Sequence, residues 1–187
     1  MNEDELIILI ILKLRGMVGR YYLASVTGLS EGRLRGILRR LKDSRMISVS
    51  KSGSTITEEG IHIVNDFLNS IGISKIIDVD LSRVFAEKMN YCLAAGLTGA
   101  LLSDRDIVHI RDAAIKAGCE AALIMKVECS SVAIPLTGLT LEHYDPELAG
   151  IVKREYGCGT YVLSACGSTL YNVVRGVLNM AKAAKRT

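Results

Sequence analysis

The feature that most constrains the fold is an amphipathic helical segment, residues 30–45, that runs directly into a short hairpin. Apolar residues recur at helical spacing along one stripe of this segment: Leu34, Ile37, Leu38 and Leu41. Such a stripe must be buried against other elements for the helix to be stable in water. Residues 46–50 and 55–57 have strand character on either side of a Gly/Ser turn, as in a hairpin. The helix and the hairpin therefore have to share one small core.

The segments around this unit are helical as well. Residues 6–18 are rich in helix formers and follow acidic residues, which the helix dipole favours in a first turn. Residues 21–26 form a second short helix before Gly28, and residues 58–71 form a helix after the hairpin. The order helix, helix, turn, helix, hairpin, helix is that of a winged helix-turn-helix domain. In this interpretation residues 30–45 are the recognition helix and residues 47–57 are the wing.

Positive charge is concentrated in the same part of the chain. Ten Lys or Arg residues lie between Lys13 and Lys51, against only Glu31 and Asp43. The remainder after Gly72 is almost balanced. A localised basic surface is typical of proteins that bind the phosphates of nucleic acids, although a solvated charged helix is the alternative.

The recognition helix contains Gly32 and Gly36, each of which costs about 1 kcal/mol of helix propensity relative to Ala. At 100° per residue both project, with Arg39, from the face opposite the apolar stripe. A face without bulk permits close approach to the DNA major groove, where Arg39 can bind a guanine edge and the flanking arginines can reach phosphates. The alternative is that the glycines let a neighbouring helix pack closely. The predicted DNA-binding residues are Ser30 at the helix start, Gly32, Arg33, Arg35, Gly36, Arg39, Arg40 and the wing-tip Lys51.

The sequence LASVTGLSEGRLRGILRRLKDSRMISVSKSGSTITEEG, residues 23–60, resembles the second helix, recognition helix and wing of prokaryotic winged-helix transcription regulators. The whole chain also resembles archaeal proteins of unassigned function in which a winged-helix domain, which we call the head, precedes a small α+β domain, which we call the tail. The frame RDAAIKAGCEAALIMKV, residues 111–127, is part of that resemblance. This resemblance implies DNA binding for the head and little about the remainder, because the group has no assigned activity.

The second part of the chain is predicted to be α+β. Strands at residues 91–97, 121–127, 132–134 and 160–165 alternate with helices at 104–117 and 146–156 in the order βαββαβ, which is the ferredoxin-like pattern. A strand at 73–79 precedes this pattern, and a helix at 168–185 follows it. We expect two domains, residues 1–72 and 73–187, the second serving for dimerisation and effector binding.

Gly167, Ser168 and Thr169 are the candidate effector site, since a strand ends there and a helix begins. Free backbone N–H groups at a helix start suit a small anion, although a plain N-cap explains the same residues. Catalysis by Asp104, Asp106 and His109 on one helix is the rival to sensing, and no catalytic or metal-binding motif supports it. We expect no cofactor and no metal.

The five cysteines are scattered and odd in number, so we expect buried thiols in place of a disulfide framework. The longest unbroken apolar run, residues 6–12, is far shorter than the ~20 residues that span a bilayer. Residues 2–5 are acidic, unlike a signal peptide. The sequence therefore predicts a cytoplasmic, homodimeric, sequence-specific DNA-binding transcription regulator. The alternative is a small-molecule enzyme or sensor whose winged-helix head binds proteins.

Overall fold

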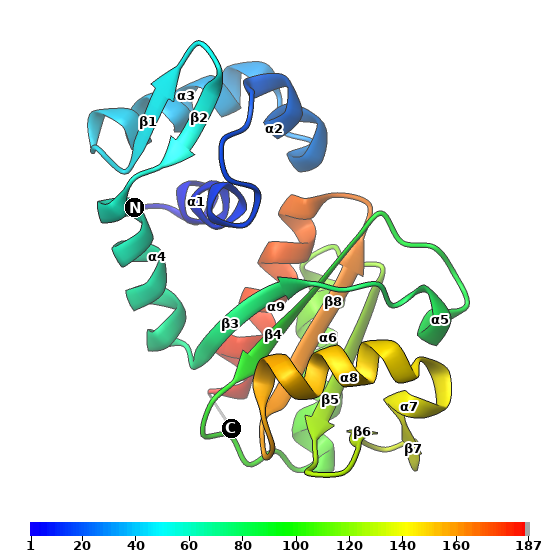
Figure 1. Cartoon of the computed structure of the whole chain (residues 1–187). Coiled ribbons are helices and arrows are strands. Elements are labelled where there is room, and N and C mark those ends of the chain that lie inside the picture. Colours follow the sequence, from blue (N-terminus) through cyan, green and yellow to red (C-terminus); the bar gives the residue numbers. More distant parts are fainter. Residues whose placement is uncertain (186–187) are drawn as a thin grey trace.

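The first six elements form the predicted winged-helix head. The structure, a computed structural model, describes residues 1–185. The head consists of α1 (Glu3–Arg15), α2 (Arg20–Thr27), α3 (Glu31–Asp43), β1 (Ile47–Ser50), β2 (Gly53–Ile56) and α4 (Glu58–Ser70). β1 and β2 form an antiparallel hairpin with a two-residue turn, and Figure 1 shows it above α1 and beside α3.

Local capping fixes where these helices begin and end. Asn2 and Glu5 form a capping box at the start of α1, and the Thr57 side chain accepts a hydrogen bond from the N–H of Gly60 at the start of α4. Gly28 ends α2 in the left-handed conformation, at φ 68°, which glycine adopts without steric cost. The turn between α2 and α3 therefore follows directly from the sequence Thr27-Gly28.

The rest of the chain forms a six-stranded antiparallel sheet with helices on both faces. Its elements are β3 (Ile73–Asp78), α5 (Ser82–Phe85), β4 (Tyr91–Leu97), α6 (Asp104–Lys116), β5 (Ala121–Val127), β6 (Val132–Ile134), β7 (Leu139–Thr140), α7 (Leu141–Tyr144), α8 (Pro146–Tyr156), β8 (Tyr161–Gly167) and α9 (Leu170–Ala184). The strand order is β3-β4-β8-β5-β6-β7. The α+β class is as predicted, and the predicted βαββαβ elements are β4, α6, β5, β6, α8 and β8, with β7 and α7 inserted before α8. β8 lies between β4 and β5, so these two strands, which α6 connects, do not pair with each other. β5 and β8, the second and last strands of the βαββαβ pattern, are the central strands of the sheet.

The sheet separates two apolar layers. One buried cluster joins one sheet face to α6, α9 and the helices of the head. A second cluster on the other face includes residues of α7 and α8. In Figure 1, α8 crosses the near face of the sheet, whereas α9 lies behind it and below α1. Head and tail therefore share one continuous core through the contact of α1 with α9.

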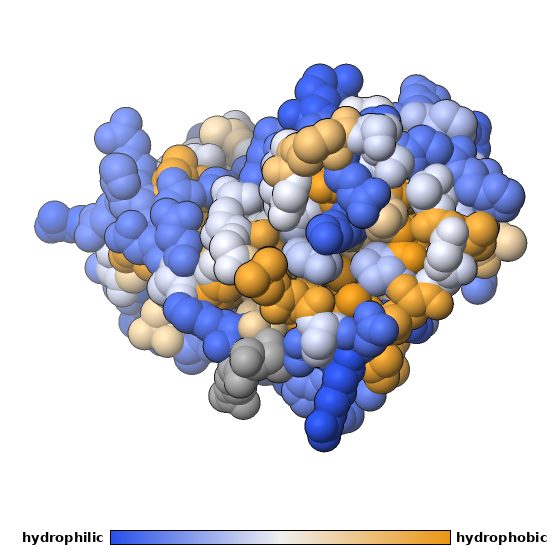
Figure 2. Space-filling view, turned by 90° about the horizontal axis from the view of Figure 1, so that it is seen from below, coloured by the Kyte–Doolittle hydropathy of each residue, from blue (hydrophilic) through white to orange (hydrophobic). Residues whose placement is uncertain are grey.

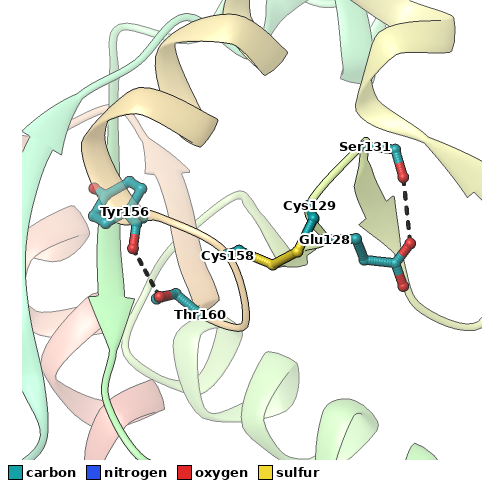
Figure 3. Close-up of a disulfide and its surroundings, with 6 residues drawn as sticks. All are labelled: Glu128, Cys129, Ser131, Tyr156, Cys158 and Thr160. Atoms are coloured by element: carbon teal, nitrogen blue, oxygen red, sulfur yellow. Dashed lines mark hydrogen bonds between the residues drawn. A yellow bond between two sulfur atoms is a disulfide. The ribbon is translucent and has the colours of Figure 1, made fainter.

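Four of the five cysteines form disulfides, so the expectation of free thiols is wrong for them. Cys92 and Cys166 lie directly opposite each other on β4 and β8, with Cα atoms 4.1 Å apart. Cys129 and Cys158 join the β5–β6 turn to the loop before β8, as Figure 3 shows. Only Cys119 is a free, buried thiol, and burial raises its pKa to about 11. The pairing depends on strand register, which the spacing of cysteines in the sequence does not reveal.

The surface carries a number of exposed hydrophobic side chains outside the head. Leu101 before α6 is 96% exposed, and Val108 and Ile115 on α6 are about half exposed. Figure 2 shows hydrophobic side chains gathered on the lower face of the molecule, among polar ones. Within residues 1–185, every helix is too short or too polar to cross a bilayer.

Candidate nucleic-acid interface

The buried stripe of α3 determines which of its side chains face solvent. Leu34, Ile37, Leu38 and Leu41 are all buried, as the periodicity predicts. Ser30 caps the helix, its hydroxyl oxygen accepting a hydrogen bond from the N–H of Arg33 at 3.4 Å. Ser30 therefore sets where the recognition helix begins.

The outer face of α3 is bare around its two glycines. A Cβ added to Gly32 would meet no atom within 4 Å, and one on Gly36 would meet only the Arg40 Nη1 atom at 3.5 Å. The Arg39 side chain is 83% exposed. No neighbouring helix of the described chain packs on these glycines, so the close-packing alternative does not explain them. The face is free for an external partner.

A basic groove lies between this face and the wing. It is a cavity of about 550 Å³ bounded by α3, the β1–β2 hairpin and the start of α2. Five cationic side chains line it: Arg20, Arg35, Arg39, Lys42 and Lys51. No acidic side chain is among the lining residues. We call this surface the basic groove.

The cations of the basic groove have weak partners or none. Arg35, Lys42 and Lys51 have no acidic partner among the described residues. Arg39 is 3.9 Å from Asp43 and Arg20 is 3.9 Å from Glu31, and all four side chains are exposed, so these pairs contribute little. Positive potential in the groove is thus not neutralised from within the molecule.

Arg33 and Arg40, in contrast, lie on the opposite flank of α3 and pair with acids of α1. Arg33 donates to Asp4 Oδ2 from Nε at 3.0 Å and from Nη2 at 2.7 Å. Arg40 Nε donates to Glu5 Oε1 at 2.5 Å. The structure therefore does not bring these two predicted DNA-binding residues into the basic groove.

Asp4 also connects the recognition helix to the tail. The Tyr171 hydroxyl of α9 donates to Asp4 Oδ1 at 2.5 Å. Burial alone would raise the pKa of Asp4, but the hydrogen bonds from Tyr171 and Arg33 outweigh it and lower that pKa. The hydrogen bond from Arg40 lowers the pKa of Glu5 in the same way. Both carboxylates are thus held ionised between α3 and the rest of the molecule.

The wing is held in place by backbone pairing with the segment before α2. Val18 exchanges two hydrogen bonds with Ser54, of 3.0 and 2.8 Å. A Cβ on the adjacent Gly53 would lie 2.5 Å from the Val18 carbonyl oxygen, so only glycine fits there. This bridge sets the distance between Lys51 at the tip of the wing and α3.

Among the cationic and aromatic residues that line the groove, three were not predicted from the sequence: Arg20, Tyr21 and Lys42. Lys42 follows Arg35 and Arg39 at i+7 and i+3, so helical periodicity alone places it on the same face. Arg20 and Tyr21 come from α2, and only the tertiary fold brings them to the wing.

The predicted effector residues lie where α9 meets α2. Gly167 is buried at the end of β8, Ser168 is exposed, and Thr169 caps α9 by accepting a hydrogen bond from the N–H of Asn172 at 3.3 Å. A Cβ on Gly28 would touch the Thr169 methyl group at 3.5 Å. Thr169 thus has a capping role in the contact between head and tail, and an effector role stays a prediction.

The residues of the rival catalytic hypothesis have structural roles or are solvated. Asp106 closes a capping box with Ser103 at the start of α6, accepting from its N–H at 2.8 Å and its hydroxyl at 2.6 Å. His109 on the same helix is exposed. Among residues 1–185 no group of three or more His, Cys, Asp or Glu side chains is arranged to hold a metal ion.

The capped helix α3, the paired wing and the basic groove form a winged helix-turn-helix head. Residues 4–71 match the family described as the CggR N-terminal DNA binding domain. The whole chain is similar to a solved structure of a hypothetical protein from Pyrococcus horikoshii OT3, with a TM-score of 0.74 and 22% sequence identity, covering 100% of this chain and 94% of that chain. No curated protein matches the sequence. The expected resemblance to winged-helix regulators with a C-terminal domain is confirmed.

Proposed function

We propose that the protein is a sequence-specific transcription regulator that reads the DNA major groove with α3. The observation that carries this proposal is the basic groove, in which five cations and no acid adjoin a helix face without side-chain bulk. A groove of one charge sign attracts the phosphate backbone and accelerates association.

Each part of the interface has a distinct task in this proposal. Arg39 offers two parallel donors to the O6 and N7 atoms of a guanine. Lys42 and Arg35 flank it on the groove side, and Lys51 reaches a phosphate from the wing. Contacts with phosphates position the domain, whereas contacts with base edges select the sequence.

The tail would pair two copies, so that two recognition helices read one operator. The exposed hydrophobic side chains of Leu101, Val108 and Ile115 supply apolar area outside the head for such an interface. A two-fold dimer would read half-sites one duplex turn apart, about 34 Å. The tail would also bind the signal to which the regulator responds.

The test is binding of the purified full chain to fragments of its own genome at several salt concentrations. Release of counterions from several phosphates makes the logarithm of the affinity fall linearly with the logarithm of the salt concentration. Arg39→Ala should reduce discrimination between selected and random fragments by about 1–3 kcal/mol, whereas Lys51→Ala should weaken both alike.

Lys88→Ala, between α5 and β4, is the matched control, because this lysine is exposed and lies outside both the basic groove and the proposed dimer surface. It should leave binding unchanged. Equal affinities for the three variants and the native chain would refute the assigned face. Tight binding of a protein partner without DNA affinity would favour the alternative role of the head.

A further inference from the structure

A second cavity lies at the junction of head and tail, away from the basic groove. It measures about 590 Å³, is open to solvent and is lined by α1, α4 and the edge strand β3, three elements that meet on the left of the molecule in Figure 1. Its lining residues are Ile10, Lys13, Leu14, Asn65, Leu68, Asn69, Ser74, Lys75 and Ile76. We call it the junction cavity. Its volume is in the range of about 300–1,000 Å³ typical of small-molecule sites.

The polar side chains of the junction cavity are cations, amides and a hydroxyl, with no carboxylate. Lys75 is paired with Glu155 outside the lining. Lys13 has no acidic partner among the described residues and donates only to the amide oxygen of Asn65. Lys13 is an exposed residue, but partial burial of its ammonium lowers its pKa, because a desolvated cation without an anion is costly. An anion beside it would remove that cost.

The apolar part of the lining comes from both sides of the junction. Leu14 of α1 belongs to the head and Ile76 to the sheet, and both are half-buried, whereas Ile10 and Leu68 lie behind them in the core. A ligand with a short hydrocarbon body could therefore bury it against both parts at once. An amino acid is disfavoured, because no acidic side chain lines the cavity to receive its ammonium group.

We propose that the junction cavity binds a small organic carboxylate, with the carboxylate at Lys13, further polar groups at the Asn65 and Asn69 amides, and the apolar body against Leu14 and Ile76.

The regulatory consequence rests on the proposed function. The junction cavity adjoins the last turns of α1, while Asp4 and Glu5 in the first turn hold Arg33 and Arg40 of the recognition helix. A ligand that shifts α1 would change the setting of α3. By linkage, the factor by which the ligand changes DNA affinity equals the factor by which DNA changes ligand affinity.

The proposal is tested with hexanoate as the anionic probe, hexylamine as its cationic match and norleucine as its zwitterionic match. Calorimetry and amide chemical shifts of the full chain report binding and its place. Hexanoate should bind saturably and shift amides within residues 10–14, 65–69 and 74–76, whereas the two matches should bind at least tenfold more weakly. Lys13→Met, which keeps the aliphatic stem, should weaken hexanoate at least tenfold, and Lys116→Met should not.

Absence of saturable hexanoate binding would overturn the proposal, as would equal binding by hexylamine or by the Lys13→Met variant. Circular dichroism of that variant should match the native spectrum, since Lys13 has no ion pair to lose. If Lys13→Met does not fold, the location of the amide shifts that hexanoate causes in the native chain tests the proposal instead. DNA affinity is measured separately, so a chain that binds hexanoate but no DNA would refute only the proposed function.

Discussion

The two flanks of the recognition helix carry the same type of residue in different states. On the side of the wing, Arg35 and Lys42 have no acidic partner and face the basic groove. On the side of α1, Arg33 and Arg40 are each bound to a carboxylate at 2.7 Å or less. Charge alone therefore does not define a binding face, because acids brought by another helix neutralise one flank.

The flank that carries Arg33 and Arg40, which we call the paired flank, also connects α3 to the rest of the molecule. Asp4 is shared between Arg33 of the head and Tyr171 of the tail. Glu3, its neighbour, lies 3.5 Å from Arg175 of the same tail helix. In the proposed function the free flank, with Arg35 and Lys42, serves recognition, while the paired flank holds α3 against α1.

Removing two cations from each flank is the most direct way to break this comparison. Arg35→Ala with Lys42→Ala should weaken DNA binding by about 2–4 kcal/mol, because both lose contact with the duplex. Arg33→Ala with Arg40→Ala should weaken it by less than about 1 kcal/mol. Binding titrations of both double variants at one salt concentration measure the difference.

The same two variants should differ in stability in the opposite order. The groove variant should unfold at the native denaturant concentration, since its side chains have no partners within the chain. The Arg33/Arg40 variant should unfold earlier, because Asp4 and Glu5 lose their cations. Equal effects of the two variants on DNA binding would contradict the assignment of the flanks.

Replacing the acid of the paired flank sharpens the comparison. Asp4→Asn should cost about 1–2 kcal/mol of unfolding free energy at neutral pH, the low end for bonds to charged groups because Arg33 is partly exposed. DNA affinity should hold or rise, since the flank loses a negative charge. Chemical denaturation and a DNA titration of the same sample measure both effects.

The pH dependence of this loss has a defined sign. The pKa values of Asp4 and Glu5 are lowered in the folded chain from 3.8 and 4.5. Their ionised forms therefore stabilise the fold above about pH 4.5, and that contribution is lost as the pH falls through the folded values. Asp4→Asn should then cost less near pH 3 than at pH 7. A loss that is the same at both pH values would show that the carboxylate charge is not the cause.

The residues of α3 also show which parts of the interface can be predicted from the sequence and which cannot. Periodicity placed Leu34 and Leu41 inside and Arg39 outside, because these properties depend on residues within one helix. The pairing of Arg33 with Asp4 spans 29 residues, and the bond from Tyr171 to Asp4 spans 167. No local pattern shows such contacts, so the sequence could not distinguish the two flanks.

In the tail, too, the longer local elements could be predicted, whereas the shortest elements and the long-range pairings could not. The strands at residues 91–97, 121–127 and 132–134 match β4, β5 and β6, since each is a mostly apolar run bounded by turn residues. The two-residue β7 and the single turns α5 and α7 are too short to give a periodic signal. The Cys92–Cys166 disulfide depends on the register of β4 against β8, which is a property of the assembled sheet.

Tyr171→Phe tests the link between the paired flank and the tail with a smaller change. Burial and the bond to Asp4 raise the pKa of Tyr171 to about 12, so the hydroxyl is a donor at all physiological pH values. Its loss should cost about 1 kcal/mol of unfolding free energy. Thermal or chemical unfolding measures this cost, and the matched control is Tyr144→Phe on α7, outside the network. Equal costs for the two variants would mean that the bond to Asp4 contributes nothing.

The smallest effect expected concerns the glycines between the two flanks. Gly32→Ala and Gly36→Ala should each stabilise the fold by about 0.5–1 kcal/mol, because both sites are helical and an added Cβ meets at most one side-chain atom, at 3.5 Å. If a duplex approaches this face, the same methyl groups should weaken DNA binding while the chain becomes more stable. Gly150→Ala on α8, also with open space around its Cβ, is the control that should gain stability without losing affinity. If all three variants gain stability and keep the native DNA affinity, the duplex does not approach the glycine face of α3. No DNA contact would then explain Gly32 and Gly36.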